Sequence, residues 1–292
     1  MKLLNFYTTD GSTALGLVQG DRVLNLTAAA KSPAFASVSA WLRAGDSVRA
    51  ETEAVRQRLS AEAGVPLASL RHAPMIDLQS RIFCVGLNYA DHAAENNLAP
   101  PPSPIFFSKL AAVVIPHGAA IPVPPAAPDQ VDYEAEVAVV IGKRADRVSE
   151  AEAWQHIAGY SIMNDVTARD LQVKDKQWFR GKNCNGFGPL GPWLVTSDEI
   201  ADVANMEVML RLNGQELQHS NTRHLIFPFN VLVSVLSQTL VLEPGDVIST
   251  GTPAGIGFHR KPQVFMHDGD RVEVEVSGIG TLVNTVASGQ EK

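Results

Sequence analysis

The fold is decided by a run of β-strand character, Val131-Asp-Tyr-Glu-Ala-Glu-Val-Ala-Val-Val-Ile-Gly142, that carries two glutamates. Side chains of a strand alternate between its two faces, so Glu134 and Glu136 emerge on one face, beside Ala138 and Val140. Two like charges this close to an apolar core repel each other and resist desolvation. A divalent cation that prefers oxygen ligands, such as Mg²⁺, is the simplest way to offset that cost. The alternative is a pair of solvated glutamates on an edge strand.

A third carboxylate, Asp165, ends another apolar stretch of strand character, His156-Ile-Ala-Gly-Tyr-Ser-Ile-Met-Asn-Asp165. The following residues, 166–172, indicate a helix entry with Thr167 as N-cap and Asp170 in a position like that of a capping box. A carboxylate at a strand end faces the rim of a sheet, where sites are often built. Asp165 could instead only support the turn.

Two later segments suggest ligand binding. Lys182 is expected in a glycine-rich loop, where the backbone can approach a ligand closely. Near a bound metal, a lysine can neutralise an anionic substrate or a developing enolate, whereas a lone lysine is usually a surface residue.

The second segment, Val247-Ile-Ser-Thr-Gly-Thr-Pro-Ala-Gly-Ile-Gly-Phe258, is a strand that runs into a turn with two threonines and lacks the spacing of a P-loop or a dinucleotide fingerprint. We interpret it as an oxyanion- or carboxylate-binding turn, with a plain tight turn as the alternative.

Together these segments resemble the fumarylacetoacetate hydrolase family, in its acylpyruvase and fumarylpyruvate hydrolase-like branch. Five motifs carry the resemblance, in the family's order, over roughly residues 80–288. They are Gly86-Leu-Asn-Tyr-Ala-Asp-His-Ala-Ala-Glu95, Asp132-Tyr-Glu-Ala-Glu-Val-Ala-Val-Val-Ile-Gly142, Asn164-Asp-Val-Thr-Ala-Arg-Asp-Leu-Gln172, Trp178-Phe-Arg-Gly-Lys182 and Ser249-Thr-Gly-Thr-Pro253.

The resemblance implies a mixed α+β fold that is mostly β. A rolled β catalytic domain would span residues 76–292, behind a small N-terminal α/β module of residues 1–75. It also implies Mg²⁺ or Mn²⁺ as cofactor, a small 2-oxo acid as substrate and a homodimer. The site residues that it implies are Glu134, Glu136 and Asp165 as metal ligands, His92, Glu95 and Lys182 as catalytic groups, and Arg169, Gln172 and Thr252 as substrate-binding groups.

The His92–Glu95 pair agrees with this on its own chemistry. The two residues are three apart, so on a helix they lie on one face and can touch. A carboxylate that accepts a hydrogen bond from an imidazole raises the basicity of the imidazole and fixes its tautomer. The pair is then a base able to activate water. By itself His92 would be an ordinary capping or surface histidine. The proline-rich run 96–104 that follows is a plausible hinge for a lid over the site.

The chain departs from the family just after the lysine. Many relatives continue as Lys-Ser-Phe-Asp-Thr-Phe, whereas this chain has Lys182-Asn-Cys-Asn-Gly-Phe187. We expect an intact metal site with different contacts, and a different pKa environment, around Lys182. Arg223 and His224 could bind a second carboxylate, or could be solvated.

Composition excludes several functional classes. The chain has 292 residues, a formal net charge of −7 and no basic block, which argues against nucleic acid as a partner. Its two cysteines, Cys84 and Cys184, suggest neither a disulfide framework nor a zinc site. The apolar stretches are too short for a signal peptide or a membrane span, so we expect no membrane partner and a cytoplasmic location.

Local patterns predict the remaining elements. They are short strands at 3–7, 14–18 and 22–26, helical segments at 37–64 and 225–240, and a hairpin of 271–276 with 280–286.

The function expected from these features is metal-dependent hydrolysis of a C–C bond in a β-diketo acid, an acylpyruvate or a fumarylpyruvate, through an enolate stabilised by the metal and Lys182. The alternative is a decarboxylase, an isomerase or tautomerase, or a hydratase that acts on a 2-oxo acid such as oxaloacetate at the same site. A third possibility is a non-enzymatic metal-binding or scaffold protein.

Overall fold

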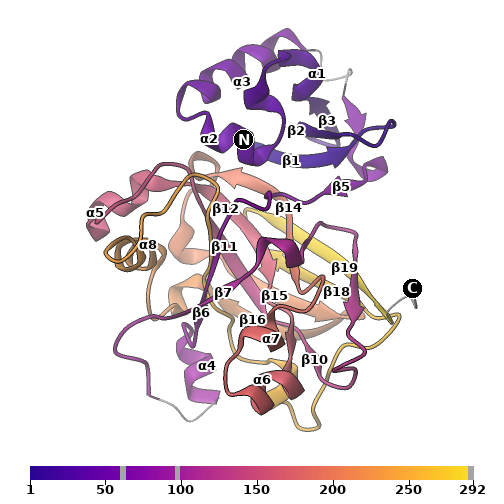
Figure 1. Ribbon diagram of the computed structural model, residues 1–292, viewed down its shortest axis with the longest axis vertical. Coiled ribbons are helices and arrows are strands. Elements are labelled where there is room, and N and C mark those ends of the chain that lie inside the picture. The colour runs from indigo at the N-terminus through magenta and orange to yellow at the C-terminus, as the bar shows by residue number, and fades with distance from the viewer. Residues whose placement is uncertain (60–63, 96–98, 289–292) are drawn as a thin grey trace.

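The computed structural model describes residues 1–59, 64–95 and 99–288 and has a mixed α+β fold in which strands predominate (Figure 1). This confirms the expected fold class. Among the described residues, no helix is long and apolar enough to cross a lipid bilayer.

The N-terminal part forms the strands that its sequence predicts. They are β1 (Lys2–Tyr7), β2 (Thr13–Gln19) and β3 (Arg22–Asn25), paired antiparallel. Three helices, α1 (Leu26–Ala30), α2 (Val38–Arg43) and α3 (Ser47–Arg58), lie against them at one end of the molecule (Figure 1).

This N-terminal part is joined to the rest through its first strand. β1 pairs with β14 (Gly188–Thr196), with Lys2 opposite Val195 and Leu3 opposite Leu194. The two parts therefore share one twelve-stranded sheet. The boundary at residue 75 stays a prediction.

The centre of that sheet is β11 (Ala135–Ile141), in which every residue is buried. It lies between β12 (Ile157–Asn164) and β17 (Val247–Ser249), and β17 is followed by β6 (Ile82–Gly86) and β7 (Ile105–Lys109). A second sheet has the order β16 (Gln215–Asn221), β15 (Glu207–Leu212), β18 (Arg271–Val276), β19 (Gly280–Ser288) and β9 (Ala120–Val123). It includes the predicted C-terminal hairpin.

The other elements are short. They are β4 (Val65–Pro66), β5 (His72–Ala73), α4 (Ala90–Glu95), β8 (Val114–Ile115), β10 (Val131–Asp132), α5 (Glu150–Ala153), β13 (Thr167–Ala168), α6 (Arg169–Asp175), α7 (Phe179–Lys182) and α8 (Phe229–Ser237).

Alternation along β11 builds two cores. Val137 and Val139 pack with the second sheet, whereas Ala138 and Val140 pack with the N-terminal part. Because residues two apart share a face, this register directs Glu136 to the side of Ala138 and Val140, as the sequence pattern predicts.

The strand directions gather several chain ends at one edge of the sheet. β11 runs antiparallel to β12 and β17, and β17 runs parallel to β6. The start of β11 and the ends of β12, β17 and β6 therefore lie at the same edge. Glu134 directly precedes β11 at this edge, and Asp165, the threonine turn and α4 come after the ends of β12, β17 and β6.

Two helix starts differ from the sequence prediction. Thr167 is not an N-cap, because β13 pairs with β10 and keeps the chain extended until α6 begins at Arg169. The Thr167 hydroxyl donates instead to the Asp165 carbonyl. The helix predicted over 225–240 begins only after Pro228.

His72 makes stability depend on pH. It is buried at the junction of β5 and β1, with its ring centroid 4.8 Å from that of His117. Burial, and next the neighbouring His117, lower the pKa of His72 to about 4. The unfolded chain therefore binds a proton at this residue between about pH 6.5 and 4 while the folded chain does not, so the free energy of unfolding should fall as the pH falls through that window.

Replacing His72 with a residue that does not titrate should flatten this dependence. Between pH 7 and 4.5, His72→Gln should lose about 2 kcal/mol less stability than the wild type, as measured by urea unfolding. The exposed His267 supplies the matched control, His267→Gln. Equal losses in the wild type and His72→Gln would contradict the prediction.

Candidate active site

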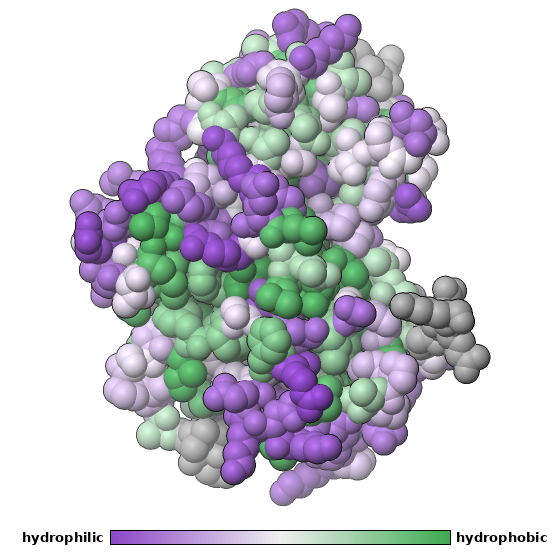
Figure 2. Space-filling view, in the orientation of Figure 1, coloured by the Kyte–Doolittle hydropathy of each residue, from purple (hydrophilic) through white to green (hydrophobic). Residues whose placement is uncertain are grey.

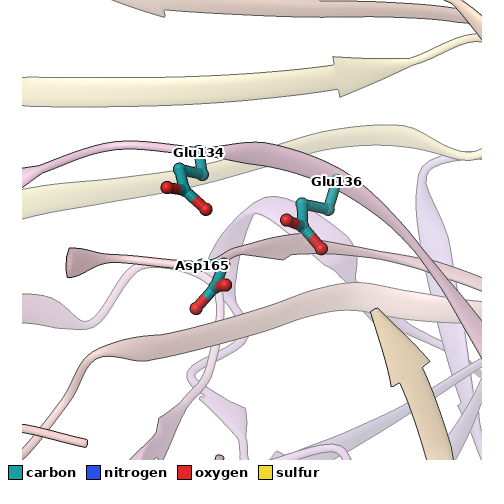
Figure 3. Close-up of side chains that lie close together, drawn as sticks. All are labelled: Glu134, Glu136 and Asp165. Atoms are coloured by element: carbon teal, nitrogen blue, oxygen red, sulfur yellow. The ribbon is translucent and has the colours of Figure 1, made fainter. Parts of the chain in front are cut away.

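Three carboxylates meet at this sheet edge. Glu134 stands just before β11, Glu136 is its second residue, and Asp165 directly follows β12. The Asp165 backbone N–H donates to the Glu134 carbonyl at 2.9 Å, which sets the two residues opposite each other. Figure 3 shows the three side chains pointing into a common space. One oxygen of each lies within 4.8 Å of one oxygen of each of the others, and all three residues are buried.

The surroundings of Glu136 favour the binding of a cation. Its carboxylate accepts hydrogen bonds only from neutral donors, the Ser249 hydroxyl and the Gly251 backbone N–H, and no cationic partner stands among the described residues. Burial, and then the carboxylates of Asp165 and Glu134, raise the pKa of Glu136 well above its usual range. A hard divalent ion would supply the compensating charge, and three carboxylate oxygens are the donors that such an ion prefers.

The other two carboxylates have cationic partners. Lys182 Nζ lies 2.8 Å from Glu134 Oε2 and 2.8 Å from Asp165 Oδ2. Arg169 Nη2 lies 2.6 Å from Glu134 Oε1. Burial alone would raise the pKa of Glu134, but Lys182 and Arg169 outweigh it and lower that pKa to about 2.

Lys182 does not lie in a loop, as the glycine content suggested. It is the last residue of the short helix α7 and is almost fully buried. Burial opposes its charge, yet the carboxylates of Asp165 and Glu134 outweigh burial and raise the pKa of Lys182 above its usual value. Lys182 therefore stays protonated.

Sequence reasoning missed a second buried lysine. Lys109 ends β7, with Nζ 2.6 Å from Asp165 Oδ1 and hydrogen-bonded to the Val166 carbonyl at 3.0 Å. The available signal was a lysine at the end of the apolar run Ile105-Phe-Phe-Ser-Lys109.

A buried aspartate, Asp132, also went unrecognised. It accepts from Arg169 Nε at 2.8 Å, and from the backbone N–H groups of Gly257 and Phe258 at 2.8 and 3.1 Å. The remaining Arg169 donor, Nη1, reaches Gln172 Oε1 at 2.9 Å. Arg169 thus binds two carboxylates and an amide, a role that holds the site together.

The buried charges do not balance among the described residues. Four carboxylates (Asp132, Glu134, Glu136, Asp165) meet three cations (Lys109, Arg169, Lys182). With all four carboxylates ionised, as a bound metal requires, one negative charge is in excess, and a divalent ion would turn it into one positive charge that attracts an anionic substrate. The residues fit Mg²⁺ or Mn²⁺.

The predicted dyad is assembled on α4. His92 Nδ1 lies 3.3 Å from Glu95 Oε2, and the Gly255 backbone N–H donates to the same carboxylate at 3.2 Å. Burial would raise the pKa of Glu95, but these hydrogen bonds lower it, so Glu95 is ionised. The predicted lid hinge includes residues 96–98, which lie outside the described residues.

A cavity of about 350 Å³ connects these groups. Both glutamates of the carboxylate set line it, together with His92, Arg169, Gln172, Lys182 and Thr252. Asp165 and Glu95 are not among the lining residues, but each contacts one: Asp165 pairs with Lys182, and Glu95 is hydrogen-bonded to His92. On the surface, hydrophilic residues gather over α6 and α7, beside hydrophobic residues in the middle of the face (Figure 2).

The side chain of Thr252 is hydrogen-bonded by a residue from outside the Ser249–Pro253 motif. Gln218 of the second sheet donates from Nε2 to Thr252 Oγ1 at 2.8 Å, and its Oε1 accepts from the Ala135 backbone N–H at 2.9 Å. Gln218 therefore links the threonine turn to the start of β11.

The altered loop after Lys182 does not line this cavity, since none of the described lining residues comes from 183–187. Asn183 Oδ1 accepts from the Leu110 backbone N–H at 2.7 Å and so connects α7 to the end of β7. Arg223 and His224 do not line the cavity either. Arg223 pairs with Glu207, and His224 Nδ1 lies 3.2 Å from Ser220 Oγ.

A second cavity of about 270 Å³ lies between α2 and β12, where Lys143 pairs with Asp46 at 2.8 Å. Among the described residues, the only group of three or more possible metal ligands is the carboxylate set. The cavity lined by Glu134 and Glu136 is therefore the candidate site.

Fold and site together define a metal-binding enzyme with a buried carboxylate set at a sheet edge. Residues 81–287 match the family model for the C-terminal region of fumarylacetoacetate hydrolase. The chain therefore belongs to the fumarylacetoacetate hydrolase family.

Known relatives agree with this assignment. The chain is 41% identical over 235 residues to a mitochondrial oxaloacetate tautomerase of Bos taurus, over 80% of this chain and 74% of the relative. Among solved structures, it resembles a fumarylacetoacetate hydrolase from Exiguobacterium antarcticum with a TM-score of 0.87 and 33% identity, over 99% of this chain and 100% of that one. It also resembles a maleylpyruvate hydrolase from Sphingobium sp. SYK-6 in complex with manganese and pyruvate, with a TM-score of 0.80, 26% identity and the same coverage.

Proposed function

We propose that this protein is a Mg²⁺- or Mn²⁺-dependent enzyme that forms an enolate from a 2-oxo acid, with tautomerisation of oxaloacetate as its reaction. The observation that carries the proposal is the buried carboxylate set with one negative charge in excess, which faces Lys182 and the His92–Glu95 dyad in one cavity. The name of the bovine relative supports the choice of oxaloacetate.

A divalent ion held by Glu134, Glu136 and Asp165 would act as a Lewis acid toward the 2-oxo acid. His92 is the base that we assign to the C3 proton, because Glu95 holds Nδ1 and leaves Nε2 as the basic nitrogen. Lys182, kept protonated by its carboxylate partners, stabilises the negative charge that develops on the C2 oxygen as the enolate forms. The proton that His92 has taken from C3 is then returned through water to that oxygen, which completes the enol and restores the neutral imidazole.

The second candidate is hydrolysis of an acylpyruvate or fumarylpyruvate, which the dyad favours. His92 and Glu95 would take a proton from water, and the resulting hydroxide would attack the distal carbonyl. The C–C bond would then break with its electron pair left on the pyruvate enolate, beside Lys182. The maleylpyruvate hydrolase among the similar structures supports this reading.

A substrate panel tests the proposal. Oxaloacetate, an acylpyruvate and fumarylpyruvate are incubated with Mg²⁺, with Mn²⁺ and with chelator. We expect enolisation of oxaloacetate that depends on metal and stops with chelator. Hydrolysis of the other two without oxaloacetate enolisation would select the second candidate. No turnover and no metal uptake would leave the non-enzymatic reading.

Replacing His92 should separate base catalysis from metal binding. His92→Gln should lower kcat by about 10²- to 10³-fold, because a positioned general base contributes about that factor. Metal affinity, measured by calorimetry, should stay within about twofold, since His92 is not in the carboxylate set. An unchanged kcat for enolisation would exclude His92 as the base.

A further inference from the structure

The donors near the carboxylate set are already engaged. All three guanidinium nitrogens of Arg169 have partners, in Asp132, Glu134 and Gln172. Lys182 divides its ammonium between Glu134 and Asp165. Three of the five N–H groups of Arg169 and two of the three of Lys182 are thus taken within the site, so neither side chain is free to serve mainly a second carboxylate on a substrate whose 2-oxo acid end lies at the metal site.

His259 is different. It lines the same cavity, half-buried, with its ring edge-on to that of His92 and the ring centroids 6.1 Å apart. Within the described part of the chain, its imidazole nitrogens make no hydrogen bond, and its ring lies against the rings of His92 and Phe258. Neutral or protonated, an imidazole offers an N–H donor.

The backbone that carries His259 is held in place. Asp132, which binds Arg169, also accepts the N–H of Gly257 and of Phe258. A side chain at position 257 has no room, because a Cβ there would lie 1.7 Å from the Val264 carbonyl oxygen. On the other side, Arg260 donates to the Gly255 carbonyl at 3.2 Å. The imidazole is therefore presented from a fixed turn, which favours binding because little conformational freedom is lost.

We propose that His259 binds the distal end of the substrate, and that this end is a carboxylate. His259 would then make the pocket selective for short 2-oxo dicarboxylic acids over 2-oxo acids with an apolar end. The inference rests on the proposed function, since it takes a 2-oxo acid gripped at Glu134, Glu136 and Asp165 as given. It adds the residue that recognises the other end, and it places that residue next to the dyad.

The test compares His259→Phe, which keeps a ring but has no donor, with His259→Gln, which keeps an N–H donor. Oxaloacetate and L-malate carry a distal carboxylate, whereas oxalate occupies the 2-oxo acid end and has nothing beyond it. KM and kcat are measured for oxaloacetate, and dissociation constants of L-malate and oxalate are measured by calorimetry on the Mg²⁺-loaded protein. His267, which is exposed and outside the cavity, supplies the control His267→Phe.

His259→Phe should raise the KM for oxaloacetate and the Kd for L-malate about tenfold, with kcat and oxalate binding within about twofold. His259→Gln should lose less than about threefold, and His267→Phe should match the wild type. The inference is overturned if L-malate binds His259→Phe as tightly as it binds the wild type, or if oxalate weakens by the same factor. A kcat loss at unchanged KM also overturns it, because that pattern marks a role in the chemistry.

The two proposals fail separately. If the wild type binds L-malate and oxalate but does not enolise oxaloacetate, the proposed function fails, and the calorimetry still decides the role of His259. If the wild type enolises oxaloacetate but His259→Phe keeps the wild-type KM and Kd values, only the inference about His259 fails.

Discussion

Glu136→Gln is expected to stabilise the metal-free protein and to remove its stabilisation by Mg²⁺ or Mn²⁺. In the metal-free state Glu136 is a buried carboxylate with only neutral donors, the Ser249 hydroxyl and the Gly251 N–H. On folding, this group either stays charged without a counter-charge or takes up a proton, and each costs free energy at neutral pH because the carboxyl is ionised in the unfolded chain. The neutral amide of glutamine avoids both costs and fills nearly the same volume. We expect a gain of about 1–2 kcal/mol in the free energy of unfolding with chelator present.

Glu134→Gln should instead lower the free energy of unfolding of the metal-free protein, although the two residues belong to the same carboxylate set. Glu134 pairs with both Lys182 and Arg169, so the amide would leave two buried cations short of a partner. Breaking a buried ion pair from one side costs about 3 kcal/mol or more. Both variants should bind Mg²⁺ weakly, because each removes one of the three carboxylate ligands.

Urea unfolding of both variants, with chelator and with saturating Mg²⁺, tests these signs. A bound metal stabilises the native state by an amount that grows with the logarithm of its concentration over its Kd, so the wild type should gain stability with Mg²⁺ and the variants should gain much less. If both variants lose stability without metal, then the charge of Glu136 is already compensated and the argument for a metal at this site fails.

Local sequence patterns predicted the carboxylate set and the dyad only in combination with the family resemblance. Glu134 and Glu136 follow from the two-residue period of a strand, and His92 and Glu95 from the spacing of helix neighbours. The same patterns predicted the strands of the N-terminal part and the C-terminal hairpin. Each of these depends on residues close together in the chain.

Contacts between distant segments could not be read this way. Lys109 lies 56 residues before Asp165, Gln218 joins Thr252 across 34 residues, and Asp132 joins Phe258 across 126. Only the folded sheet brings such pairs together, because a contact of this kind leaves no period or spacing in the sequence. The helix that holds Lys182 was missed for a related reason: its glycines indicate a loop, but packing against α6 and β13 stabilises a helical turn there.

Lys182→Met is expected to bind the metal more tightly than the wild type and to be a much poorer catalyst. Removing the ammonium leaves the buried site with one more negative charge in excess, so Mg²⁺ affinity should rise by about tenfold. The enolate, however, loses the cation that faces it in the cavity. Removing one preorganised donor of this kind typically lowers kcat by about 10²- to 10³-fold.

Lys109→Met separates the two effects. Lys109 also pairs with Asp165, so its loss should likewise strengthen metal binding, but it does not line the cavity and cannot touch the substrate. We therefore expect a comparable rise in Mg²⁺ affinity by calorimetry, with a kcat loss below about tenfold. If Lys109→Met loses as much kcat as Lys182→Met, then Lys182 acts only through the charge balance of the carboxylate set. If Lys182→Met alone loses kcat, the ammonium of Lys182 acts on the substrate itself, since both variants change the buried charge by the same amount.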